Sequence, residues 1–417
     1  MTVHPSRTLF AGTAALVTTG LTVALLSAPT PGAYAAVPSC SGQTPTLVAT
    51  EDGQRLDGTA GADVISTAGF DGVRVDAKGG DDLICSTALT NSAVLAGAGH
   101  DTIIDEIGPT SVDGYLKETW VRSGPGDDRI VGGPATKTRA DYLESTTGVV
   151  VRLDLGTVAE GPDIDTLVGI HDVQGSNHRD LFVGSAGDDV FDTGYFPRRG
   201  TKKDRDVVRT GAGDDTVTGR HARIELGPGD DEAAVASADV FGGPGDDRIN
   251  LETGGAAHGG EGADVLSSGN DFDEGGERPV AVRLLGGPGP DRLQPATAYT
   301  VEQERCPKVC ARSFLDGGTG RDTLVLVENR SRVDLAARRY RAAAARARLR
   351  SLENVLGTPT AEVIRGDGRR NVIEGKGGND VLAGRGGRDV LIGGRGSDRA
   401  DGGPGRDRCQ AERVRSC

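Results

Sequence analysis

One apolar residue recurs at a fixed place in a nine-residue unit along the C-terminal part of the chain. From residue 357 to residue 410 six units follow one another without a gap, reading GTPTAEVIR, GDGRRNVIE, GKGGNDVLA, GRGGRDVLI, GGRGSDRAD and GGPGRDRCQ. Their shared form is G-G-x-G-x-D-x-U-x, in which U is apolar. The x-U-x triplet alternates as a short half-buried strand does, and the glycines before it favour a tight turn because they tolerate positive φ.

The same unit recurs upstream with longer spacers. Its aspartates are 19 residues apart from Asp63 to Asp101 and 16 or 17 apart from Asp215 to Asp264. Short alternating segments such as 73–75 and 222–226 lie between the units. We therefore expect each coil of the chain to hold a glycine turn, a short strand, a plain turn and a second short strand. The upstream units are GTAGADVIS (58–66), AKGGDDLIC (77–85), AGAGHDTII (96–104), SGPGDDRIV (123–131), GSAGDDVFD (184–192), TGAGDDTVT (210–218), LGPGDDEAA (226–234), GGPGDDRIN (242–250), GGEGADVLS (259–267), GGPGPDRLQ (286–294) and GGTGRDTLV (317–325).

Stacking such coils predicts an all-β fold, a parallel β-roll or β-helix solenoid. Coils about 4.8 Å apart would pair their strands and bring the turns of one side together. Carbonyl oxygens of one turn and an aspartate carboxylate of the next would then form a cage of oxygen atoms. Ca²⁺ takes 6–8 oxygen ligands at about 2.3–2.6 Å. Because the apolar residues make a core only one side chain thick, we expect calcium to supply much of the cohesion.

These units resemble the repeats-in-toxin (RTX), haemolysin-type calcium-binding family, whose fold is a parallel β-roll. Two segments are similar to the linker coils that flank such repeats: residues 151–155 with 170–176, and residues 332–335 with 352–358. They match each other and nonamers follow both, so the roll is expected to continue through them.

The resemblance implies that the sixth-position aspartate of each intact unit binds calcium. Glu362 and Asn371 depart from the pattern at this position, and Asp180 lacks the turn glycines. The fifth-position aspartates Asp127, Asp188, Asp214, Asp230 and Asp246 are expected to be solvated. The implied ligands are Asp63, Asp82, Asp101, Asp128, Asp189, Asp215, Asp231, Asp247, Asp264, Asp291, Asp322, Asp380, Asp389, Asp398 and Asp407.

The first 35 residues are typical of a cleaved export signal. Arg7 gives a small positive region, residues 9–26 are mostly apolar, and the sequence Ala-Tyr-Ala at 33–35 fits a cleavage site. No later run approaches the ~18 apolar residues of a membrane span. We therefore expect a secreted, extracellular protein with a signal peptide at 1–35, a spaced and degenerate roll at 36–356, a tandem calcium-binding roll at 357–410 and a disulfide cap at 411–417.

Six cysteines follow the predicted signal, an even number that favours disulfides in an exported chain. Fifteen connectivities are open for six cysteines. Their positions favour local closure, which pairs Cys40 with Cys85, Cys306 with Cys310 and Cys409 with Cys417.

Composition excludes several classes of function. The formal net charge of −14 disfavours nucleic acid as a partner. The sequence contains no HExxH and no GxSxG motif, which argues against a zinc protease and a lipase. Repeats begin at residue 58 and leave no space for an appended catalytic domain. We expect a non-catalytic, calcium-binding protein with a structural or surface-interaction role. The alternative is a lyase- or epimerase-like enzyme that acts on polysaccharide and uses carboxylates of a β-helix as acid and base.

One segment departs from the acidic trend. From Arg338 to Arg350 the sequence RRYRAAAARARLR holds six arginines and a run of four alanines, which are good helix formers. It predicts a basic helix that faces an anionic cell-wall or other extracellular polymer. A solvated surface insertion is the alternative.

Overall fold

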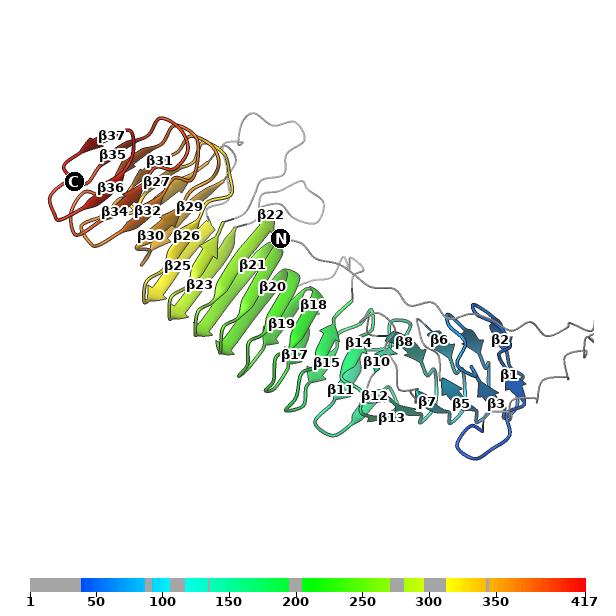
Figure 1. Cartoon of the computed structure of the whole chain (residues 1–417). Helices are drawn as coiled ribbons and strands as arrows, with labels where there is room; N and C mark the ends of the chain where they lie inside the picture. The colour runs from blue at the N-terminus through cyan, green and yellow to red at the C-terminus, as the bar shows by residue number, and fades with distance from the viewer. Residues whose placement is uncertain are drawn as a thin grey trace, which may run out of the picture. The chain divides into compact units, whose positions relative to one another are not determined.

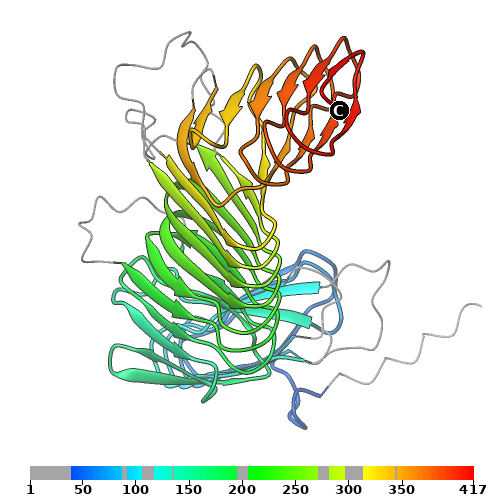
Figure 2. The same cartoon turned by 90° about the vertical axis from the view of Figure 1, so that its left-hand side faces the viewer.

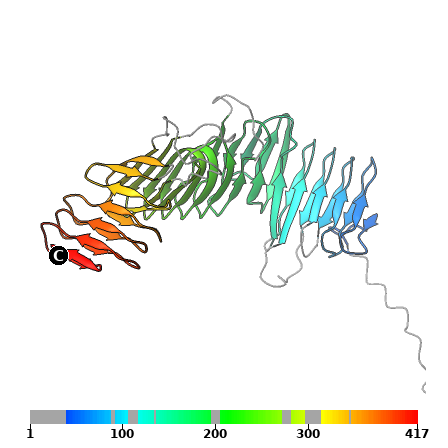
Figure 3. The same cartoon turned by 90° about the horizontal axis from the view of Figure 1, so that it is seen from above.

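All regular elements of the described chain are strands, which form successive coils stacked along one axis (Figures 1 and 3). The structure is a computed structural model, and it describes residues 39–86, 92–105, 117–133, 136–194, 205–270, 281–295, 313–342 and 345–417. Within these ranges no helix is long and apolar enough to cross a membrane. Residues 1–35, Cys306 and Cys310 lie outside the described ranges.

Hydrogen bonding between coils arranges the strands in two columns, A and B. Strand β20 (Glu232–Pro244) and strand β21 (Arg248–Glu261) are long enough to pair in both columns. The other strands of column A are, in spatial order, β1 (Leu47–Val48), β3 (Val64–Ser66), β5 (Leu83–Ser86), β7 (Thr102–Asp105), β9 (Arg129–Val131), β13 (Asp163–Val168), β12 (Thr157–Glu160), β11 (Val149–Arg152), β15 (Leu181–Val183), β17 (Asp206–Arg209), β19 (Ala222–Glu225), β23 (Val282–Pro288), β25 (Ser313–Thr319), β29 (Arg346–Arg350), β28 (Arg339–Arg341), β27 (Arg332–Asp334), β31 (Val363–Arg365), β33 (Val381–Ala383), β35 (Arg399–Asp401) and β37 (Arg413–Arg415).

Column B contains one strand from nearly every coil. Its other strands are β2 (Arg55–Asp57), β4 (Arg74–Asp76), β6 (Ser92–Leu95), β8 (Lys117–Arg122), β10 (Thr136–Asp141), β14 (Asp172–Gln174), β16 (Val190–Asp192), β18 (Thr216–Arg220), β22 (Val265–Asn270), β24 (Arg292–Gln294), β26 (Thr323–Val325), β30 (Asn354–Leu356), β32 (Val372–Glu374), β34 (Val390–Ile392) and β36 (Arg408–Gln410). Figure 2 shows the strands of neighbouring coils side by side. The pairing is parallel outside two short segments, so the predicted parallel β-roll is confirmed.

The register follows the repeat. In the tandem block Val381 pairs with Arg399 and Val390 with Arg408, so each coil contains two nonamers. The eighth-position side chain of each unit points inward. The core is therefore a stack of single side chains: Ile65, Ile84, Ile103 and Ile130 in the first coils of column A are all at most 1 % exposed, and the Phe182 and Phe191 rings lie 5.2 Å apart between the columns.

Two antiparallel segments interrupt the parallel pairing in column A. Strands β11, β12 and β13 form one, and β27, β28 and β29 form the other. They arise at the two predicted linker regions, and strands on both sides keep the column continuous.

The helix predicted between Arg338 and Arg350 is wrong, because this segment supplies strands β28 and β29. Arginine alternates there with Tyr340, Ala347 and Leu349, which are at most 8 % exposed. A period of two buries these three side chains against the core, and this burial outweighs the helix propensity of alanine and arginine.

Disulfides lie near both ends of the described chain. Cys40 is bonded to Cys85 and Cys409 to Cys417, with Cα–Cα distances of 5.5 and 5.9 Å. Two of the three predicted local pairings are thus confirmed, and the third, Cys306 with Cys310, lies outside the described residues.

Candidate metal centres in the glycine turns

The glycine turns need glycine for conformation and for stacking. Gly243 and Gly245, at the second and fourth positions of their unit, have φ of 131° and 139°, in the left-handed region. A Cβ on either residue would collide with the carbonyl oxygen of Gly227 or Gly229 in the preceding coil. Turns of successive coils therefore lie backbone against backbone, with main-chain oxygens at the contact.

A ladder of aspartates connects these turns. In thirteen of the fifteen sixth-position aspartates, Oδ1 accepts the N–H of the sixth-position residue one coil earlier. Asp247 accepts from Asp231 and Asp264 accepts from Asp247, both at 3.0 Å. In the tandem block the Asp380 N–H donates to Asp398, 18 residues on, at 2.8 Å. This backbone bond fixes the orientation of each carboxylate.

The other carboxylate oxygen, Oδ2, is buried and makes no hydrogen bond within the described chain in thirteen of these aspartates. Asp247, Asp264 and Asp291 are themselves fully buried. An anionic oxygen that is shielded from water and has no donor costs several kcal/mol unless a cation compensates it. The thirteen are Asp82, Asp101, Asp128, Asp215, Asp231, Asp247, Asp264, Asp291, Asp322, Asp380, Asp389, Asp398 and Asp407.

The pKa values of these aspartates reflect the same unfavourable burial of negative charge. Burial raises the pKa of Asp247 to about 7, the N–H of Asp231 opposes the rise, and the charges of Asp264 and Asp231 add to it. Burial likewise raises the pKa of Asp291 to about 7 and that of Asp264 to about 6. Without a cation the ladder is therefore a stack of carboxylates that resist ionisation.

The donor set suits one kind of metal. No group of three or more His, Cys, Asp or Glu side chains converges on a point within the described residues. Each turn instead offers one carboxylate together with main-chain oxygens, and soft or nitrogen-preferring metals such as zinc are disfavoured. Ca²⁺ accepts such an oxygen set in flexible geometry, whereas Mg²⁺ demands a near-ideal octahedron. The residues present thus fit calcium.

The family model for the RTX calcium-binding nonapeptide repeat (4 copies) matches residues 173–194, 202–220, 257–274, 356–391 and 374–409. The chain carries RTX calcium-binding nonapeptide repeats. Such repeats bind Ca²⁺ at multiple sites, so the protein is a calcium-binding β-roll. A comparison with curated proteins finds no match.

Two of the fifteen predicted ligands lie in a second class of RTX turn. The Oδ2 of Asp63 accepts the N–H of Thr59 at 2.7 Å and its hydroxyl at 3.0 Å. The Oδ2 of Asp189 accepts the N–H of Ser185. We call these turns closed, because hydrogen bonds within the turn satisfy the carboxylate, and we call the thirteen others open.

The second position of the unit distinguishes the two classes. Closed turns have Ser, Thr or Asp there, whose short side chains favour local hydrogen bonds. Open turns have a residue with positive φ there, usually glycine. The three sixth-position residues that departed from the pattern are all in closed turns: Asp180, Glu362 and Asn371 accept from the N–H of Ser176, Thr358 and Asp367, respectively.

The open turns change sides along the roll. In the first coils they lead into column A, with Asp82, Asp101 and Asp128. In the middle coils, from Asp215 to Asp322, they lead into column B. The tandem block has open turns on both sides, and Asp389 pairs there with Asp407 at 2.8 Å.

Sequence patterns missed the carboxylates that end these ladders. Asp165 accepts the Asp128 N–H at 3.0 Å, and its Oδ2 accepts from Tyr142 at 2.8 Å and Ser123 at 3.1 Å. Glu353 and Glu412 likewise accept at sixth positions. None of the three lies in a recognisable nonamer. Only their alignment with the preceding coil identifies them.

Basic residues stand at three junctions between a closed and an open turn. Among the thirteen open turns described, those without glycine at the second position have Lys78, Lys376 or Arg385 there, each with φ between 72° and 76°. Lys78 Nζ donates to the carbonyl of Gly58, and an Arg385 nitrogen donates to that of Gly366, both at 2.8 Å. These carbonyls belong to closed turns, so a basic side chain, and not a metal ion, occupies the space beside them.

The fifth-position aspartates form a second, outer ladder. Asp230 accepts the N–H of Asp246 at 2.8 Å, and Asp246 accepts that of Ala263 at 2.7 Å. They are exposed to solvent, and stacking also places each carboxylate beside an N–H of a neighbouring coil.

Asp389→Ala should lower calcium affinity by about tenfold or more, since it removes an anionic ligand and the acceptor for the Asn371 N–H. Asp246→Ala should leave calcium affinity nearly unchanged and lower the free energy of unfolding by about 1 kcal/mol through its lost hydrogen bond.

Double substitutions test which aspartates share a side of the roll. Adding Asp407→Ala to Asp389→Ala should lower calcium affinity by less than the sum of the single changes, whereas adding Asp380→Ala, on the other side, should be closer to additive. Calcium titration calorimetry decides; equal losses from Asp246→Ala and Asp389→Ala would contradict the ladder.

The pH dependence should reverse sign with calcium. Because the folded-state pKa values of Asp247, Asp264 and Asp291 are raised, the calcium-free protein loses stability as pH rises through about 6–7. In chelator, lowering the pH from 7.5 to 5 should therefore raise the fraction of the chain that is folded. In calcium and urea the same change of pH should lower the folded fraction, because protons compete with the metal. Circular dichroism at both pH values measures the folded fraction, and the same sign in both conditions would refute the prediction.

Calcium stoichiometry tests the division into open and closed turns. Nine ladder rungs connect two open turns, namely two in the first coils, five in the middle and two in the tandem block. We expect about nine bound ions, one per rung, rather than one per aspartate.

The double substitution Thr59→Gly with Lys78→Gly should open a closed turn and add one ion, while Thr59→Ser should add none. Native mass spectrometry counts the ions, and unchanged stoichiometry in the glycine variant would contradict the assignment.

Proposed function

We propose that this protein is exported and acts outside the cell as a non-catalytic, calcium-stabilised structural or surface-interaction protein. The predicted signal at residues 1–35 supports export. The disulfides Cys40–Cys85 and Cys409–Cys417 agree with it, because disulfides persist in oxidising compartments.

The geometry of the carboxylates carries the non-catalytic part of the proposal. A general acid or base must be within hydrogen-bond reach of the substrate. In the thirteen open turns one oxygen of the sixth-position carboxylate accepts a backbone N–H, and the other is buried between turns. Such carboxylates are placed to hold metal inside the roll and not to meet a polymer on its surface.

Calcium then acts as the folding ligand. A core one side chain thick and a column of repelling carboxylates leave little to hold the coils without metal, so metal binding free energy becomes folding free energy. An exported chain of this kind would stay disordered at low calcium and assemble its coils where calcium is plentiful.

The folding part of the proposal is tested by circular dichroism. In chelator the tandem repeats should be largely disordered, and millimolar Ca²⁺ should restore β-structure, whereas Mg²⁺ at the same concentration should not. Identical spectra with and without chelator would defeat the proposal.

The non-catalytic part has its own test. Incubation of the calcium-loaded protein with pectin and with other uronic-acid polymers should release no new reducing ends and no unsaturated products. Either product would instead favour a polysaccharide-active enzyme.

A further inference from the structure

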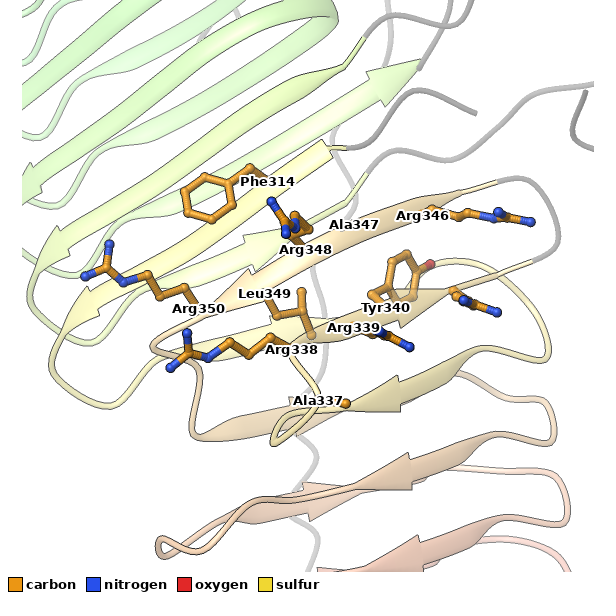
Figure 4. Close-up of a pocket in the computed structure, with 11 residues that line it drawn as sticks. Phe314, Ala337, Arg338, Arg339, Tyr340, Arg346, Ala347, Arg348, Leu349 and Arg350 are labelled. Atoms are coloured by element: carbon orange, nitrogen blue, oxygen red, sulfur yellow. The ribbon is translucent and has the colours of Figure 1, made fainter. Parts of the chain in front are cut away.

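The outer side of strands β27, β28 and β29 carries a cluster of exposed arginines, with the carboxylate of Asp334 at its edge. In β28 and β29 every second residue points inward, so Arg339, Arg341, Arg346 and Arg348 are exposed. Arg332 is exposed in the same way on β27. We call these five residues the arginine face. Arg346 and Arg350 extend from the ribbon at opposite ends of β29 (Figure 4).

The strand register places these positive charges directly opposite one another. Arg341 pairs with Arg332 on one side and with Arg346 on the other. Arg339 pairs with Arg348 on one side and with Asp334 on the other. Like charges at directly opposed positions of a sheet are destabilising. The arrangement therefore costs stability unless an anion lies over it.

Some arginines elsewhere on the roll are neutralised by a carboxylate. Arg55 contacts Asp76, and Arg139 contacts Asp172, each at 2.8 Å. Within the described chain, the five residues of the arginine face form no ion pair. Asp334, the carboxylate nearest to them on β27, is held by Arg385 through two bonds of 2.8 Å. The charge of the arginine face is thus left for a partner.

The surface beside the arginine face is hollowed and has an aromatic side chain. A cavity of about 590 Å³ is lined by Phe314 together with six arginines, namely Arg338, Arg339, Arg341, Arg346, Arg348 and Arg350. Phe314 is half-buried on β25 and pairs with Arg348 on one side and Arg283 on the other. A planar apolar ring between guanidinium groups offers a stacking surface next to sites for anions.

We propose that the arginine face and Phe314 bind a linear acidic polysaccharide that bears one carboxylate on each sugar. This inference rests on the proposed surface-interaction role. Neighbouring strands are about 4.8 Å apart, so a single chain lying across β29, β28 and β27 meets a guanidinium on each strand. Each guanidinium binds a carboxylate with two parallel hydrogen bonds, and a sugar ring stacks on Phe314.

The surroundings favour a single polysaccharide chain over a nucleic-acid duplex. The chain has a formal charge of −14, and acidic turns border both columns. A duplex carries one charge per ~1.7 Å and is broad, so much of it would face these turns. A chain with one charge per sugar brings few charges beyond the arginine face.

The test compares two variants of the calcium-loaded protein that lose the same charge. One carries Arg339→Gln, Arg341→Gln, Arg346→Gln and Arg348→Gln. The control carries Arg74→Gln, Arg129→Gln, Arg248→Gln and Arg399→Gln, at exposed strand positions elsewhere. Binding to polygalacturonate is measured by affinity electrophoresis at about 0.15 M salt, where long-range effects are screened. The first variant should bind at least about tenfold more weakly than wild type and the control within about threefold.

Two further measurements separate specific contact from general charge. Replacing the same four arginines by lysine keeps the charge but removes the paired hydrogen bonds, so binding should be intermediate. Phe314→Ala should weaken binding of polygalacturonate while leaving its salt dependence unchanged, because no charge is lost. Circular dichroism and calcium titration of each variant establish that the roll is intact, and if the glutamine variant does not fold, the lysine variant carries the test.

Several outcomes would overturn the proposal. Acidic polysaccharides bind calcium, so an ion could bridge polymer and protein; binding that is unchanged in both glutamine variants would indicate such a bridge, and equal loss in the two would indicate general charge attraction. Duplex DNA that binds as tightly as polygalacturonate, or dextran that binds at all, would also refute it. A wild-type protein that folds normally in calcium but does not bind polygalacturonate contradicts this inference alone, whereas release of sugar products contradicts only the non-catalytic role.

Discussion

The roll depends on one hydrogen bond, from the backbone N–H of a sixth-position residue to the Oδ1 of the corresponding aspartate in the next coil. The bond sets the register of neighbouring coils and turns each carboxylate so that its second oxygen is buried. A buried oxygen without a donor needs a cation. The same contact, repeated from Asp82 to Asp407, therefore accounts for the strand register, for the glycines of the turns and for the need for metal.

The second position of the unit determines what satisfies the second oxygen. A glycine with positive φ leaves it open, whereas Thr59 or Ser185 donates to it from within the turn. Closed turns need no metal, and Lys78 and Arg385 bring their own positive charge to the junctions. The chain thus compensates its buried carboxylate oxygens in three ways: with a metal ion, with a hydrogen-bond donor of the same turn, or with a basic side chain. This mixture lets degenerate coils remain in a continuous stack.

The sequence predicted the repeat well where the pattern is local, as in the tandem block and the inward apolar positions. It failed where the fold overrides composition. The Arg338–Arg350 segment suggested a helix because alanine and arginine favour one, but the alternation with Tyr340 and Leu349 decides its structure. Asp165 and Glu412 could not be found, since only their register against Asp128 and Asp398 gives them a role. No pattern within a nine-residue stretch of the sequence marks such positions.

The two electrostatic systems of the roll affect each other. Acidic turns border the columns, while the arginine face lies on the outer side of column A, and the chain as a whole carries a formal charge of −14. Without metal this field repels an acidic polymer, although the arginines attract it over short distances. Nine bound divalent ions would offset the whole formal charge. Calcium would then not only join the coils that position Arg341 and Arg346 but also remove the long-range repulsion that opposes the proposed polymer partner. Folding and polymer attraction would consequently depend on the same ion.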